Sequence, residues 1–153
     1  MAKFYGQGAT EYLVLLAVVL IIALVSIALL GFFPGMSTDT KIAQSRAYWN
    51  SAYPFSIKSH MMSSTSTLGN QLVVQNMDST GTNTITAITI NGIAANNTST
   101  AFAPGETKTV NVALPVGSTG AVYDYPVVFT YSSAAGLTGV KQNGTKTITG
   151  KYS

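Results

Sequence analysis

The hydrophobic and polar positions divide the chain into two parts with different patterns. Residues 12–33 contain no charged residue and consist mostly of Leu, Val, Ile and Ala, with Ser26 as a polar exception. At about 1.5 Å per residue, a helix over this run spans roughly 33 Å, which matches the hydrocarbon core of a bilayer. Because the run has no polar stripe, we expect apolar material on every side of the helix, either lipid or a bundle of identical helices.

The sequence Phe32-Phe33-Pro34-Gly35 predicts an interruption of this helix, because proline lacks an amide donor and disfavours helix at the residue before it. A second helical stretch is expected over 37–53, with Ser37 or Thr38 as its cap. An irregular linker is the alternative, and Pro54 ends the stretch in either case. The positions that recur at helical spacing are Ile42, Ser45, Trp49 and Ala52.

From Phe55 onward the pattern changes to short β-branched runs separated by Gly, Asn and Pro. Such runs predict an antiparallel sandwich or barrel. Two Asn-Gly pairs, 91–92 and 143–144, are typical of tight turns. The expected strands are 71–76, 83–90, 108–114, 125–131 and 145–152.

Alternation within these runs predicts which side chains face a core. Val110, Val112 and Leu114 would point inward, as would every second residue from 127 to 131. Ile85 and Ile88 are out of phase for one face, so we expect a bulge or a change of face between them.

The charge content is low and excludes several classes of function. Only 8% of residues are charged, the net charge is +3, and the basic residues form no cluster, so a nucleic-acid partner is not expected. The chain has no cysteine, which removes disulfides and thiolate chemistry. His60 is the single histidine, and we interpret it as a solvent-facing residue near a strand, not as a metal ligand.

No motif for catalysis or cofactor binding is present. There is no serine elbow, no phosphate-binding loop and no H-E-x-x-H sequence, so we expect neither an enzyme nor a cofactor. Asp78 and Glu106 lie in turn-like sequences, where turn hydrogen bonding explains a carboxylate better than acid–base chemistry does. Asn96, Asn97 and Asn143 begin N-x-[ST] sequons, and we expect glycan on at least one of them.

Residues 1–33 allow three interpretations. The apolar run is longer than the core of a typical secretory signal peptide and does not end in an A-x-A site. A plain membrane anchor fits the length of the run but gives no role to Glu11, which directly precedes it. The third interpretation is that Gly6 and the residues after it form a processing site directly before a filament helix.

Residues 6–12, Gly-Gln-Gly-Ala-Thr-Glu-Tyr, resemble the class III leader site of archaeal type IV pilins. The resemblance implies cleavage between Gly6 and Gln7, with Glu11 at the fifth mature position and Tyr12 after it. Ala9 replaces the serine that is frequent in that family. Residues 44–57 are similar to the helix-to-strand junction of those pilins.

The resemblance implies an α+β fold, in which a long N-terminal hydrophobic α-helix precedes a C-terminal antiparallel β-sandwich head of the Ig-like type. The expected parts are a leader (1–6), a transmembrane and filament-core helix (7–33), a linker with a helical extension (34–54) and the head (55–153). It also implies assembly contacts at Gln7, Glu11 and Tyr12.

The same resemblance implies that the subunit has two successive locations. The subunit would wait in the cell membrane, be processed by a leader peptidase and be extracted by an assembly ATPase and its platform. It would then form a homopolymeric surface filament that serves adhesion. The alternatives are a single-span membrane-anchored β-sandwich binding module, an archaeal flagellin or, within the pilin class, a bacterial tight-adherence pilin.

Overall fold

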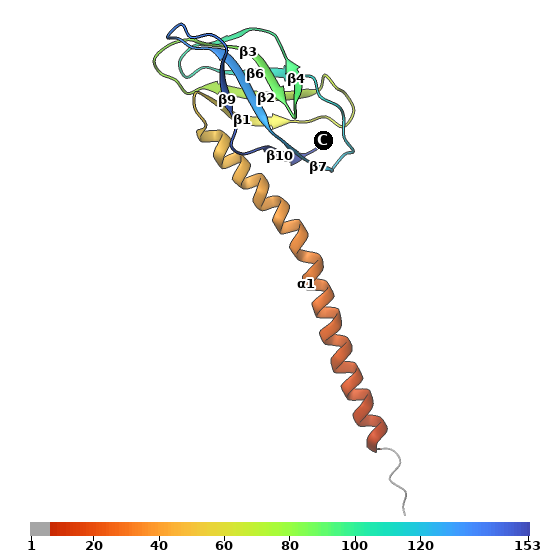
Figure 1. Cartoon of the computed structure of the whole chain (residues 1–153). Coiled ribbons are helices and arrows are strands. Elements are labelled where there is room, and N and C mark those ends of the chain that lie inside the picture. The colour runs from red at the N-terminus through yellow and green to blue at the C-terminus, as the bar shows by residue number, and fades with distance from the viewer. Residues whose placement is uncertain (1–6) are drawn as a thin grey trace, which may run out of the picture. The chain divides into compact units, whose positions relative to one another are not determined.

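The computed structural model describes residues 7–153, and for residues 7 and 32–36 it describes the backbone alone (Figure 1). One helix, α1 (Gln7–Ser51), is followed by ten strands, so the expected α+β class is confirmed. Residues up to Asp39 and residues from Thr40 onward form two separate compact units. The second unit, Thr40–Ser153, is called the head below and includes the last turns of α1.

The expected interruption at 32–35 is wrong, because α1 continues through these residues. A proline inside a helix removes one hydrogen bond at a cost of about 3 kcal/mol. That cost is local, and the helical hydrogen bonds on both sides of Pro34 remain. Ser37 and Thr38 therefore lie inside a continuous helix and do not cap a second one.

The strands form three antiparallel sheets. One sheet has the order β1-β2-β6, the second has β4-β3-β8-β9 with β5 also paired to β3, and the third joins β10 to β7. Their bounds are β1 Phe55–Met61, β2 Asn70–Asn76, β3 Asn83–Ile90, β4 Ile93–Asn96, β5 Thr100–Phe102, β6 Thr107–Val112, β7 Val122–Tyr125, β8 Val127–Ser132, β9 Val140–Asn143 and β10 Ile148–Lys151.

A single core lies between the two larger sheets, as in a sandwich. The ring of Phe55 in β1 is 5.6 Å from that of Phe102 in β5 and 5.7 Å from that of Phe129 in β8. Trp49 of α1 joins the same core, with its ring 6.1 Å from Phe129. The buried faces of both sheets and the last turns of α1 thus remove one continuous apolar surface from water.

Register and burial agree with the alternation in the sequence. Val110, Val112 and Leu114 are buried, and the alternate residues 109, 111 and 113 are exposed. The pairing of β3 with β8 shifts between Ile85 and Ala87, which confirms the expected bulge and lets both out-of-phase isoleucines, Ile85 and Ile88, reach the core.

The two Asn-Gly pairs differ in the structure. Asn91 and Gly92 have φ angles of 52° and 76° and form the tight turn between β3 and β4. Asn143-Gly144 is not such a turn, so that expectation is wrong. Gly144 instead lies against the six-membered ring of Trp49, where a Cβ atom would overlap with the indole.

Candidate functional site: the apolar helix and the base of the head

The segment of α1 from Gly8 to Gly31 presents an unburied apolar surface. Gly8–Gly31 is a 24-residue segment that is long and apolar enough to cross a membrane, and an 18-residue stretch within it has a mean hydropathy of 3.4. Every side chain described in this segment is exposed, with Leu30 at 71% and Leu15 at 66%. A surface of this size and composition requires lipid or other helices around it.

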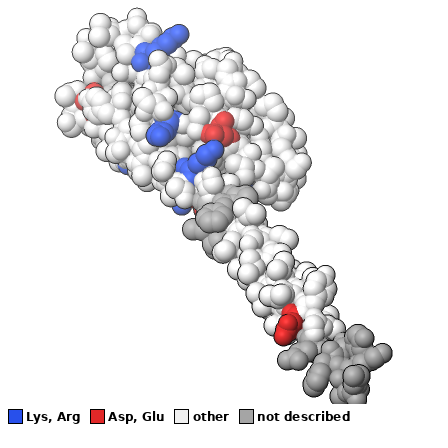
Figure 2. Space-filling model, turned by 60° about the horizontal axis from the view of Figure 1, so that its bottom comes forward, with Lys and Arg blue, Asp and Glu red and all other residues white. Residues whose placement is uncertain are grey.

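Glu11 is the one acidic residue within this segment, and on the face of the helix that Figure 2 shows, an acidic side chain lies near the start of an otherwise uncharged described surface. Glu11 and Tyr12 are both exposed. Gln7 is the first residue that the structure describes and is helical, and four residues along a helix place Glu11 about 6 Å further along the axis, roughly one turn away. Gly6 lies outside the described residues.

Within the described part of the chain, the structure brings no basic side chain to Glu11. The one salt bridge there joins Lys108 to Glu106 at 3.1 Å, at the edge of β6. A carboxylate surrounded by hydrocarbon requires a cation or a proton. Any permanent cationic partner of Glu11 therefore comes from outside the described residues, either from the N-terminal end of the chain or from another molecule.

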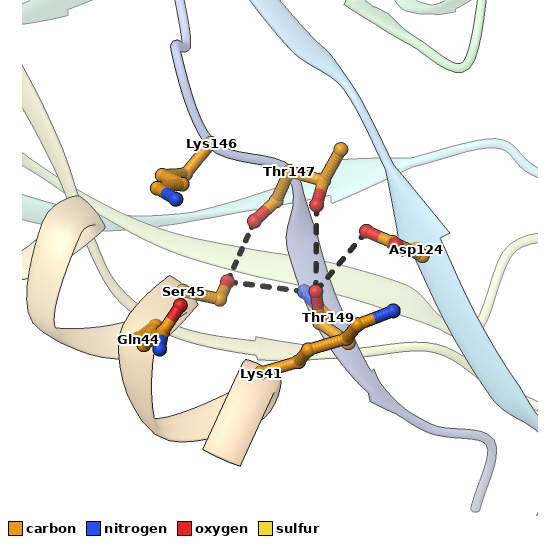
Figure 3. Close-up of a pocket in the computed structure, with 7 residues that line it drawn as sticks. All are labelled: Lys41, Gln44, Ser45, Asp124, Lys146, Thr147 and Thr149. Carbon is orange, nitrogen blue, oxygen red and sulfur yellow. Dashed lines mark hydrogen bonds between the residues drawn. The ribbon is translucent and has the colours of Figure 1, made fainter. Parts of the chain in front are cut away.

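Within the head, the last turns of α1 are fixed to the strands by a buried serine, Ser45 (Figure 3). The Ser45 hydroxyl donates to the carbonyl of Thr147 at 2.7 Å and accepts the backbone N–H of Thr149 at 3.1 Å. Tyr48 adds a third link, because its hydroxyl accepts the N–H of Thr145 at 3.0 Å. Helical spacing grouped Ser45 with Trp49 and Ala52, but the two hydrogen bonds of its hydroxyl depend on residues about a hundred positions away.

Beside Ser45 lies a polar pocket of about 210 Å³ (Figure 3). Two lysines line it, one from α1 and one from the loop before β10, and Asp124 of β7 lies opposite. The Asp124 carboxylate accepts the Thr149 hydroxyl at 3.1 Å. The complete lining is Lys41, Gln44, Ser45, Asp124, Lys146, Thr147 and Thr149.

His60 belongs to a cluster of aromatic rings and is half-buried, so its expected solvent-facing position is wrong. Its Nδ1 lies 2.7 Å from the Tyr123 hydroxyl. Burial, with a smaller contribution from Arg46, lowers the pKa of His60 to about 4, and burial raises the pKa of Tyr123 to about 12. Both groups are neutral at pH 7, and nothing around them resembles a catalytic dyad with an acid.

Asp78 and Glu106 have the turn roles that their sequences predicted. The Asp78 carboxylate accepts the N–H of Thr80 at 2.9 Å and its hydroxyl at 2.6 Å, and it also accepts from Asn83 at 3.1 Å. These hydrogen bonds, those from Thr80 first, lower the pKa of Asp78 to about 2. Glu106 accepts the N–H of Ala103 at 2.8 Å.

The three sequon asparagines differ in accessibility. Asn97 and Asn143 are exposed. Asn96 is partly buried, with its side-chain amide donating to the Asn111 carbonyl at 2.7 Å and its oxygen accepting the N–H of Thr98 at 2.7 Å. Attachment of a sugar to Asn96 would replace one hydrogen of a side-chain amide that already forms hydrogen bonds with the backbone.

Among the described residues, no three His, Asp or Glu side chains are grouped so that they could hold a metal ion. Comparisons with models of protein families and with curated proteins find no match to this chain.

Proposed function

We propose that this chain is a structural subunit of an archaeal type IV-like pilus. The subunits polymerise by packing Gly8–Gly31 of one helix against the same segment of others, and the heads form the outer surface, which serves adhesion. Before assembly the same segment holds the subunit in the cell membrane.

The single observation that carries the proposal is the combination of an apolar surface exposed on every side with one carboxylate at its start. Lipid alone satisfies the apolar surface but leaves Glu11 at the edge of the hydrocarbon without a partner. A bundle of identical helices satisfies both, because cleavage after Gly6 creates an amine on Gln7 that a neighbouring subunit can offer to Glu11.

The packing of the last turns of α1 supports a role in a filament. Ser45 and Trp49 make these turns part of the core of the head, so these last turns cannot separate from the strands without breaking that core. A filament under tension needs such a connection in every subunit. A flexible tether to an anchored binding module would not require it.

The assembly route follows the leader site. A peptidase removes residues 1–6, and an ATPase with its platform moves the mature subunit from the membrane into the filament. The exposed Asn97 and Asn143 are the preferred glycan acceptors on the outer surface, since the amide of Asn96 is engaged with Asn111.

Electron microscopy of cells that produce the chain with an epitope label in the exposed loop after β8 tests the proposal. We expect the label along the whole length of surface filaments, and we expect those filaments to be lost when the gene is deleted. Label confined to the cell envelope, with no change in filaments on deletion, would support the single-span binding module instead.

A further inference from the structure

A second pocket in the head, of about 290 Å³, lies between the last turns of α1 and β1. Unlike the pocket beside Ser45, it has no carboxylate in its lining. Hydrogen-bond donors and cations predominate there instead. The lining consists of Arg46, Trp49, Ile57, Lys58, Ser59 and His60.

Two permanent cations of this pocket have no carboxylate partner among the described residues. Arg46 is exposed, and the one salt bridge in that part of the chain lies elsewhere, between Lys108 and Glu106. Lys58 donates to the carbonyl of Asn50 at 3.0 Å, which fixes its ammonium group at the C-terminal end of α1. The pocket is therefore a region of positive potential with no internal counter-charge.

Trp49 contributes a donor that nothing in the described part of the chain accepts. Its indole Nε1 is fully buried and has no hydrogen-bond partner there. Buried N–H groups almost always have an acceptor, because the hydrogen bond to water that is lost on burial must be replaced. Trp49 thus carries an unpartnered N–H group on a residue that lines a cationic pocket, and the nitrogen itself is closed to solvent in this structure.

His60 adds a neutral imidazole to the same lining. Tyr123 from β7 and Arg46 from α1 face it, and the Tyr123 hydroxyl shares a hydrogen bond with Nδ1 at 2.7 Å in which either group can be the donor. When the hydroxyl donates, the hydrogen of the neutral ring is on Nε2. An acceptor at this nitrogen would complete the hydrogen bonding of the imidazole.

We propose that this pocket binds a small oxyanion, namely a sulfate, phosphate or carboxylate group, between the Arg46 guanidinium and the Lys58 ammonium. The planar fork of arginine suits two oxygens of such a group, and the ammonium of Lys58 and, when Tyr123 donates to Nδ1, the Nε2–H of His60 suit the others. The chemistry of the pocket does not depend on filament assembly.

The single tryptophan and the single histidine of the chain both line the pocket, so each is an unambiguous reporter. Sodium sulfate should be titrated into the full chain in detergent against sodium chloride of equal ionic strength. We expect a saturable change in Trp49 fluorescence with sulfate alone. We also expect the pKa of His60, followed by NMR, to rise from about 4 toward 6.5, because a bound anion favours the imidazolium.

Arg46→Gln should weaken sulfate binding by roughly tenfold or more, since a charge-assisted hydrogen bond is lost. Lys141→Gln is the matched control, because it removes the same charge from an exposed position of β9 outside the pocket. Equal responses to sulfate and chloride, or an Arg46→Gln titration that matches the control, would overturn the proposal.

A further arm separates the sources of the oxyanion. Glucose 6-sulfate and inorganic sulfate should both compete for the pocket. Tighter binding of the sugar sulfate would identify a glycan-borne group as the ligand, and equal binding would identify the free ion. Failure of both to affect Trp49 and His60 would again overturn the proposal.

Discussion

Gly144 lies against the six-membered ring of Trp49, so closely that a Cβ atom at position 144 would overlap with ring atoms Cζ2 and Cη2. The contact joins the last turns of α1 to the loop after β9. The glycine is required by this close approach and not by a positive φ angle, since Gly144 is not among the glycines with that conformation.

Gly144→Ala should lower the free energy of unfolding by about 1–3 kcal/mol, because the added methyl group must displace a buried indole. The measurement is urea denaturation of the full chain in detergent, followed by circular dichroism. In the double variant with Trp49→Phe, the smaller ring should relieve much of the Gly144→Ala penalty. Strict additivity of the two changes would contradict the account of this contact.

Ser45→Ala should cost about 1–3 kcal/mol, because the buried N–H of Thr149 and the carbonyl of Thr147 both lose their partner. Ser51→Ala is the control. That exposed hydroxyl contacts only carbonyls of its own helix, at 3.3 and 3.1 Å, so its loss should stay within about 0.5 kcal/mol. Thermal unfolding of both variants distinguishes them, and equal melting temperatures would remove the structural role assigned to Ser45.

The stability of the head should fall as the pH drops from about 6.5 to about 4. In the folded state the pKa of His60 is lowered from 6.5 to about 4, so the unfolded chain takes up the proton first. This contribution is fully present above pH 6.5 and is lost as the pH falls through 4, at a maximum of roughly 3 kcal/mol. Urea denaturation in chloride buffers at pH 7.5, 5.5 and 4 measures it.

His60→Gln should remove the dependence of stability on pH between pH 6.5 and 4. The dependence that is due to carboxylates should remain. Asp78 titrates lower, since the pKa of its carboxyl is lowered to about 2, and its contribution is lost only as the pH falls below 4 toward 2. If His60→Gln retained the full slope above pH 4, the lowered pKa of His60 would not be its cause.

Sequence patterns predicted the strands whose alternation is regular. The structure explains why the patterns did not predict the other strands. Strands β2, β3 and β6 match the expected runs to within a residue or two. The pairing of β1 shifts between Ile57 and Ser59, which breaks its alternation, and β4, β5 and β9 have only three or four residues each. Short or irregular strands offer too few positions for a period to be recognised.

The candidate sites were predictable to different degrees. The apolar helix segment Gly8–Gly31 could be predicted because its signal is local, a long uncharged run, whereas the roles assigned to Gly6, Gln7, Glu11 and Tyr12 stay predictions. The pockets could not, because α1, β1, β7 and β10 supply their residues from distant positions. The link between β9 and β1 is of the same kind, since the Gln142 amide both accepts from and donates to the backbone of Phe55, at 3.0 and 2.8 Å.

Glu11→Ala should leave leader cleavage and membrane insertion intact but lower the yield of filaments roughly tenfold or more. Removal of one member of a buried charge pair leaves the other unpaired, at about 3–5 kcal/mol. Glu11→Gln should be milder, because it keeps the shape and a hydrogen-bond acceptor. The measurement is the amount of sheared filament relative to the amount of subunit in the membrane.

Asp39→Ala serves as the control for Glu11, because it removes a negative charge from the same helix outside the apolar segment. We expect its filament yield to be normal. Normal yield in Glu11→Ala as well would show that Glu11 has no role in assembly and would favour the plain anchor.

The most direct test of the central claim is mass spectrometry of intact subunits from surface filaments that have been sheared from cells and purified. The account predicts that these filaments consist mainly of this chain and that its first residue is Gln7, with any glycan appearing as added mass on the head. A chain that begins at Met1 or Ala2 in the filaments, or that is found in the membrane fraction alone, would contradict it.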